Sequence, residues 1–119
     1  MPVQNDFESV MAAYPALEAV IRMSRDGLPL SSRVCGGAPI DEIVSIVAGL
    51  FAAATETGLI DGKNGGRLHI DARHGSLYCR AEDAQTLLLF LTRDHHTEQQ
   101  FEVMFETIRK LYRPKTIQH

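Results

Sequence analysis

The segment from Met23 to Ser32 constrains the fold of this chain more than any other part of the sequence. It places an Asp26-Gly27 pair between two segments in which apolar residues recur. Asp-Gly is a strong local signal for a β-hairpin, because a type I′ turn needs positive φ at both central residues. We therefore expect a strand over Leu17–Ser24 and its partner over Leu28–Val34. Pro29 cannot donate a ladder hydrogen bond, which predicts that the second strand lies at a sheet edge.

Hydrophobic periodicity assigns the other elements. The expected helices run from Asn5 to Tyr14, from Asp41 to Thr57, and from Thr97 to the residues before Pro114; the expected strands are Gly66–Arg73, Ser76–Ala81 and Leu87–Leu91. The unbroken apolar run Leu87–Leu91 is typical of a strand buried on both faces, so it should be central. The order α-β-β-α-β-β-β-α predicts an α+β sandwich, a mostly antiparallel five-stranded sheet with helices on both faces.

Local signals at the element ends support this assignment. Asp41 is expected to cap the long helix and Gly58 to follow its last turn. Thr97 and Gln100 have the spacing of a capping box. His74-Gly75 is expected to form a two-residue turn between two strands.

The length of 119 residues predicts one domain over residues 1–119, with a core at about 5–112 and a flexible tail at 113–119. A net charge of −3 argues against nucleic acid as a partner, and no apolar run is long enough for membrane insertion. The N-terminal residues lack the basic and apolar regions of a signal peptide. Cys35 and Cys79 fall in separate expected elements and are interpreted as reduced thiols. We therefore expect a cytoplasmic protein.

Four groups of residues suggest chemistry, and each has a simpler interpretation that we prefer. Asp94-His95-His96 contains good metal ligands, but it also suits a polar loop before the Thr97 cap. His69 and Asp71 share one strand face near His74, where they suggest a weak metal site, a proton-active pair or a solvated face.

The other two groups are a glycine-rich loop and a cysteine. Gly62-Lys63-Asn64-Gly65-Gly66 resembles a phosphate-binding loop without the Ser or Thr that follows the lysine. Cys35 has no positioned base in the sequence and is interpreted as an inert thiol. We therefore expect no catalytic, metal or cofactor site, and no enzyme.

The helix Asp41–Thr57 carries more apolar residues than one core-facing stripe needs. An apolar patch left on a single chain marks an interface, so we expect self-association through this helix. The strand that contains His69 should lie at the second sheet edge and supply another contact. The expected dimer or partner interface comprises Ile43, Ile46, Val47, Leu50, Phe51, Ala54, His69 and Asp71.

The whole pattern resembles the Roadblock family, which includes a class of dynein light chains and bacterial regulators of Ras-like GTPases. The hairpin Val20–Ser32, the alanine-rich helix, the later strands with Arg93-Asp94 and the final amphipathic helix carry the resemblance. It implies the strand order 2-1-5-4-3 and a homodimer in which the middle helices pair and the third strands join two sheets. It also implies regulation of a small Ras-like GTPase, as activator or scaffold, by holding its switch segments rather than inserting a catalytic residue. The first helix is shorter than the family pattern.

The leading hypothesis is therefore a non-enzymatic homodimeric regulator of a small Ras-like GTPase. The alternative is a dimeric adaptor in a signalling or motility complex without a GTPase. A small-molecule sensor ranks third. A metal-dependent enzyme built on His69, Asp71, His95 or His96 ranks last.

Overall fold

A computed structural model describes residues 5–61 and 66–111 of the 119-residue chain. The elements are α1 (Asn5–Ala13), β1 (Leu17–Ser24), β2 (Pro29–Val34), α2 (Ile40–Glu56), β3 (Arg67–Asp71), β4 (Ser76–Ala81), β5 (Thr86–Thr92) and α3 (Glu98–Leu111). They follow the expected order, and each boundary lies within two residues of its prediction. The tail expected at 113–119 lies outside the described residues.

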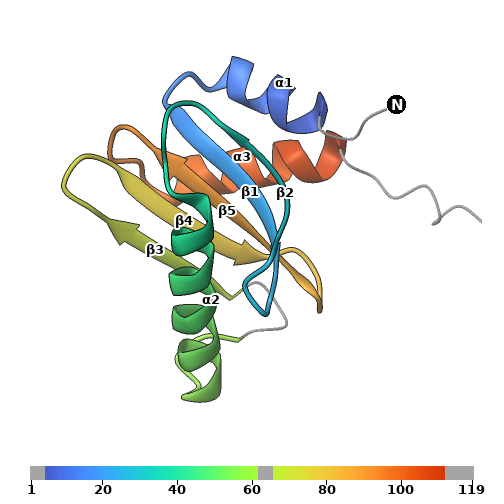
Figure 1. Ribbon diagram of the computed structural model, residues 1–119, viewed down its shortest axis with the longest axis vertical. Helices are drawn as coiled ribbons and strands as arrows, with labels where there is room; N and C mark the ends of the chain where they lie inside the picture. The colour runs from blue at the N-terminus through green and yellow to red at the C-terminus, as the bar shows by residue number, and fades with distance from the viewer. Residues whose placement is uncertain (1–4, 62–65, 112–119) are drawn as a thin grey trace, which may run out of the picture.

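The five strands form one antiparallel sheet in the order β2-β1-β5-β4-β3 (Figure 1). Phe90 of β5 pairs with Val20 of β1 on one side and with Tyr78 of β4 on the other. This arrangement confirms that β5 is central and that the strand containing Pro29 lies at an edge. Strand β3 forms the opposite edge.

Helices cover both faces of the sheet, as Figure 1 shows, and each face has its own hydrophobic cluster. On one face Val44, Val47, Ala48 and Phe51 of α2 pack on the sheet, together with Ile21, Cys79 and Leu89. On the other face α1 and α3 pack on Val20, Tyr78 and Phe90. The predicted α+β sandwich is therefore confirmed.

The hairpin turn between β1 and β2 differs from the prediction in its type. Only Gly27 has positive φ (95°), whereas a type I′ turn would need positive φ at Asp26 as well. Gly27 N–H donates to Ser24 O over 3.1 Å, and Ser24 N–H donates to Leu28 O over 2.9 Å. The loop is therefore three residues long, Arg25-Asp26-Gly27, with glycine in the left-handed position that such loops favour. The β1–β2 register shifts separately from the loop, between Arg22 and Met23, because Arg22 pairs with Ser31 and Met23 with Pro29, which leaves Leu30 of β2 without a partner in β1.

Two of the expected helix ends are confirmed and one is wrong. Helix α2 begins at Ile40, so Asp41 lies within the first turn, where its charge still favours the helix dipole. At the other end Gly58 N–H donates to Thr55 O and Leu59 N–H donates to Ala54 O, which closes the helix as glycine usually does. For α3, Thr97 N–H donates to Gln100 Oε1 (2.8 Å) and Gln100 N–H donates to Thr97 Oγ1 (3.2 Å), as the capping box predicts.

The turn between β3 and β4 lies one residue earlier than expected. Ala72 N–H donates to Gly75 O over 2.8 Å, which places Arg73 and His74 at the centre of the turn. A Cβ at Gly75 would collide with the backbone carbonyl of Thr92. The glycine is therefore required here because the turn passes directly against β5.

Candidate interaction surface

Helix α2 has a buried side and an apolar exposed side. Val44, Val47, Ala48 and Phe51 are at most 8% exposed and face the sheet. Ile46 is 63% exposed and Leu50 is 44% exposed. We define the α2 stripe as Ile43, Ile46, Leu50, Ala53 and Ala54, which recur at helical spacing along one flank of α2, where Ile43 also packs against the α2-side core cluster.

The α2 stripe contains four of the six helix residues expected at an interface. Ile43 and Ala54 are half-buried, and Ile46 and Leu50 are exposed. Val47 and Phe51 instead belong to the core of the single chain, at 1% and 2% exposure. The sequence could not separate them, because both sides of this helix are apolar.

The second part of the surface is the free edge of β3. Strand β3 pairs with β4 on one side, and no described strand pairs with its other side. Ile70 is 39% exposed and shares a sheet face with Leu68, which packs against the α2-side cluster. The open edge of β3 thus carries an exposed apolar side chain, Ile70, on the face of the sheet that α2 covers.

His69 and Asp71 lie on the opposite face of β3, beside α3. The His69 ring meets the Phe101 ring edge-on, with 5.3 Å between centroids, and its Nε2 lies 3.2 Å from Asp71 Oδ1. The Ser76 hydroxyl donates to Asp71 Oδ1 over 2.6 Å, and mainly this bond lowers the pKa of Asp71. The two residues therefore contribute to the strand edge but not to the side that carries the α2 stripe.

A charged network fixes α3 against this edge of the sheet. Glu102 accepts hydrogen bonds from the Tyr78 hydroxyl and from Arg80, and Glu98 accepts one from Arg67 over 2.6 Å. Burial, with the nearby Glu102 carboxylate, raises the pKa of Tyr78 well above its usual range. Tyr78 therefore stays a neutral donor to Glu102, which suits a structural rather than a chemical role.

The remaining candidates have structural partners. His95 Nε2 lies 2.6 Å from Ala72 O, and the His96 backbone N–H donates to Ser76 Oγ over 3.1 Å, so this loop braces the β3–β4 turn. Residues 5–61 and 66–111 contain no group of three or more His, Cys, Asp or Glu able to hold a metal ion. The loop at 62–65 with phosphate-loop character lies outside the described residues. Cys35 is exposed, whereas burial raises the pKa of Cys79 to about 12.

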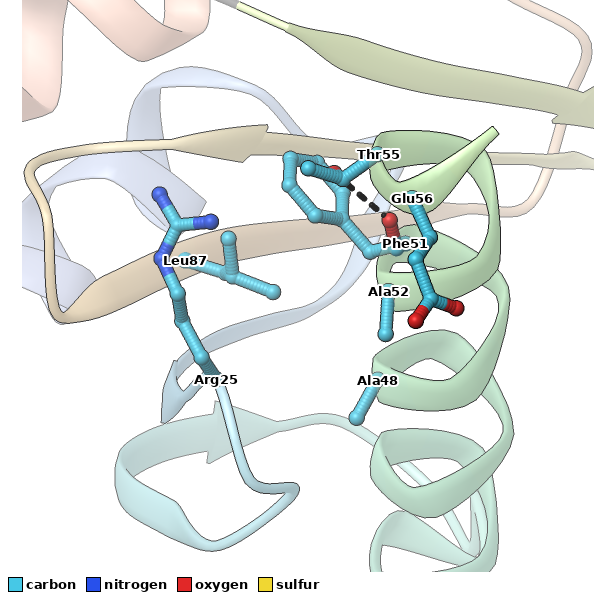
Figure 2. A pocket seen from close by; sticks show the side chains of 7 residues that line it. All are labelled: Arg25, Ala48, Phe51, Ala52, Thr55, Glu56 and Leu87. Carbon is cyan, nitrogen blue, oxygen red and sulfur yellow. Dashed lines mark hydrogen bonds between the residues drawn. The ribbon is translucent and has the colours of Figure 1, made fainter. Parts of the chain in front are cut away.

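The other flank of α2 borders a hollow that the sequence pattern did not predict. Arg25 of the hairpin turn, Ala48, Phe51, Ala52, Thr55 and Glu56 of α2, and Leu87 of β5 line it (Figure 2). Its volume is about 300 Å³. The only sign of the hollow in the sequence is the pair Ala48 and Ala52, which are four residues apart and so share one flank of the helix. The sequence could not show that the hairpin turn faces these alanines.

Comparison with solved structures identifies the fold. The Roadblock/LC7 domain from Streptomyces avermitilis matches with a TM-score of 0.75, and the match covers 93% of this chain and 95% of that one at 15% identity. The chain has the Roadblock/LC7 fold. MglB from Myxococcus xanthus gives a TM-score of 0.70 at 16% identity, over 87% of this chain and 85% of that one. The gliding protein MglB of Thermus thermophilus gives 0.72 at 16% identity, over 90% and 83%.

The likeness to Roadblock/LC7 structures lies in the fold. No protein-family model matches the sequence, and no curated protein sequence matches it either. Among the described residues, no helix has the length and apolar content needed to cross a membrane.

Proposed function

We propose that this Roadblock-fold chain is a non-enzymatic, homodimeric regulator that binds a small Ras-like GTPase in the cytoplasm. The observation that carries the proposal is the α2 stripe, in which Ile46 is 63% exposed and Leu50 is 44% exposed. It lies on the same side of the sheet as the open β3 edge. The resemblance of the sequence to bacterial Roadblock regulators supports the GTPase as the partner class.

Two copies of the α2 stripe can cover each other across a two-fold axis. Each copy would remove the partner's isoleucine and leucine side chains from water, and burial of apolar area is the main favourable term in such associations. The free edges of β3 would pair at the same time, because unpaired N–H and C=O groups of an edge strand readily accept a second strand. The two five-stranded sheets would then become one.

Such a dimer would act on a GTPase by holding it rather than by adding a reacting group. The switch segments of a GTPase adopt more than one arrangement. A regulator that binds one arrangement more tightly than another increases its population, and the difference between the two affinities limits how far the hydrolysis rate can change. The partner would therefore show a changed rate or a changed nucleotide preference while supplying every catalytic group itself.

The dimer is tested with Ile46→Asp and Leu50→Asp. Both side chains are exposed in the single chain, so a carboxylate there leaves the fold intact but would be buried in the dimer, where an unpaired charge is strongly unfavourable. We expect both variants to be folded monomers by circular dichroism and light scattering at micromolar concentration. Val103→Asp is the matched control, because Val103 is 52% exposed on α3. Two variants that remain dimeric would refute the proposed interface.

The GTPase is tested by single-turnover GTP hydrolysis by the cognate Ras-like protein, measured with and without this chain. We expect binding, together with a changed hydrolysis rate for an activator or an unchanged rate for a scaffold. Absence of binding would refute the partner class. Recovery of kinases or motor components without any nucleotide-binding protein would instead support the adaptor alternative.

A further inference from the structure

The hollow beside α2 exists because small side chains face the hairpin turn. A Cβ at Gly27 would lie 3.4 Å from Ala48 Cβ, so the turn already touches the helix at this point. One helical turn further on, Ala52 again offers only a methyl group, and the space in front of it stays open (Figure 2). A volume of about 300 Å³ lies at the lower end of the range for small-molecule sites.

The base of the hollow is apolar and belongs to the hydrophobic core between α2 and the sheet. Phe51 and Leu87 are 2% and 1% exposed, and Ala48 and Ala52 complete the apolar lining. The Thr55 hydroxyl donates to Phe51 O over 2.8 Å within the helix. Water in such a space finds few polar partners, so an apolar group that displaces it gains free energy.

Two opposite charges border this apolar base from different elements. Arg25 comes from the hairpin turn and Glu56 from the last turn of α2, and Figure 2 shows them on opposite sides of the alanine methyl groups. The Arg25 guanidinium is held in place, because its Cζ lies 5.5 Å from the Phe51 ring centroid and Nη2 donates to Asp83 O over 3.0 Å. A guanidinium fixed in this way is a preorganised partner for a carboxylate.

We propose that this hollow binds a small zwitterion with an apolar middle. Its carboxylate pairs with Arg25, its apolar part lies on Phe51 and Leu87, and its ammonium group pairs with Glu56. A carboxylate alone would be repelled by Glu56, and an amine alone by Arg25, so the charge pair selects a molecule that carries both. The hollow and the α2 stripe lie on different flanks of the helix, so the site stays open when the stripe is covered.

Three probes of matched chain length test the charge pattern: 6-aminohexanoate, hexanoate and hexylamine. Each is titrated at millimolar concentration into the ¹⁵N-labelled 119-residue chain, with amide shifts as the readout. We expect 6-aminohexanoate to bind most tightly and to shift the amides of Ala52, Thr55 and Leu87. Equal binding of the three probes, or shifts confined to other regions, would overturn the proposal.

Variants test the location without any partner protein, so the result does not depend on the proposed GTPase. Ala52→Leu fills the hollow and should abolish the shifts, whereas Ala12→Leu, at an exposed helical position of α1, should leave them unchanged. Arg25→Gln should weaken 6-aminohexanoate about tenfold or more, since it removes a charge-assisted hydrogen bond. Glu56→Gln should remove the preference for 6-aminohexanoate over hexanoate without unfolding the chain. Full binding to Ala52→Leu would place the ligand elsewhere and refute the site.

Discussion

Arg22 and Glu82 form a largely buried ion pair, and its loss should strongly destabilise the fold. Arg22 of β1 donates from Nε to Glu82 Oε1 (2.7 Å) and from Nη2 to Oε2 (2.8 Å), and the two side chains are only 10% and 11% exposed. The Arg22 guanidinium also lies over the Phe7 ring, with Cζ 5.1 Å from its centroid. The pair therefore links the centre of the sheet to the β4–β5 loop and to α1.

We predict that Arg22→Met lowers the free energy of unfolding by about 3–5 kcal/mol, because it leaves the Glu82 carboxylate buried without its cation. An exposed pair would contribute only about 0–1 kcal/mol. Whole domains are stable by about 5–15 kcal/mol, so this single change consumes a large part of the total. The double variant Arg22→Met/Glu82→Leu should recover most of the loss, since an apolar pair of similar size removes the stranded charge.

Urea denaturation followed by far-ultraviolet circular dichroism measures both variants, because the chain has no tryptophan to serve as a fluorescence probe. The wild-type chain and the exposed pair variant Arg33→Met are the controls; Arg33 pairs with Glu8 and is 51% exposed. A loss below about 1 kcal/mol for Arg22→Met would refute the reasoning. So would a double variant as unstable as the single one.

Three further predictions follow from other contacts. Thr97→Ala should lower the free energy of unfolding by about 1 kcal/mol in urea, because Gln100 N–H loses its cap; no change would contradict the capping box. Cys35 should react with a thiol reagent at pH 8 while Cys79, whose pKa burial raises to about 12, reacts only in denaturant; two fast thiols would contradict this. Burial raises the pKa of Asp83, but the Gln85 and Thr86 backbone N–H groups, the Thr86 hydroxyl and the Arg25 charge together outweigh it and hold the pKa below its ordinary value of 3.8. Ionised Asp83 therefore stabilises the fold above that pH and loses this effect as pH falls, so the deficit of Asp83→Asn in urea should shrink on acidification.

The sheet could be predicted from the sequence because its signals are local and redundant. Pro29 predicted an edge position for its strand, and the apolar run at Leu87–Leu91 predicted a central one. The observed strand order has both strands in these positions. The Thr97–Gln100 capping box was equally readable because both partners lie within one helical turn.

The turn types and the surface could not be predicted in the same way. Asp26-Gly27 fits a two-residue turn and a three-residue loop equally well, and the closing bond between Ser24 and Leu28 decides which forms. Val47 and Leu50 are both apolar, yet only the position of the sheet buries the first and exposes the second. The hollow was hidden for the same reason, because Arg25 and Ala52 approach each other only in the folded chain.

The pairing of β1 with β5 has a consequence for synthesis on the ribosome. Ser24 pairs with Thr86, so the central seam of the sheet joins segments roughly 60 residues apart. At about 5–20 residues per second, β1 waits for about 3–12 s before its partner is translated. During that interval β1 has only β2 beside it, and one of its edges is open to other nascent chains. A second copy emerging from the same message could therefore meet this chain before either one has closed its own sheet.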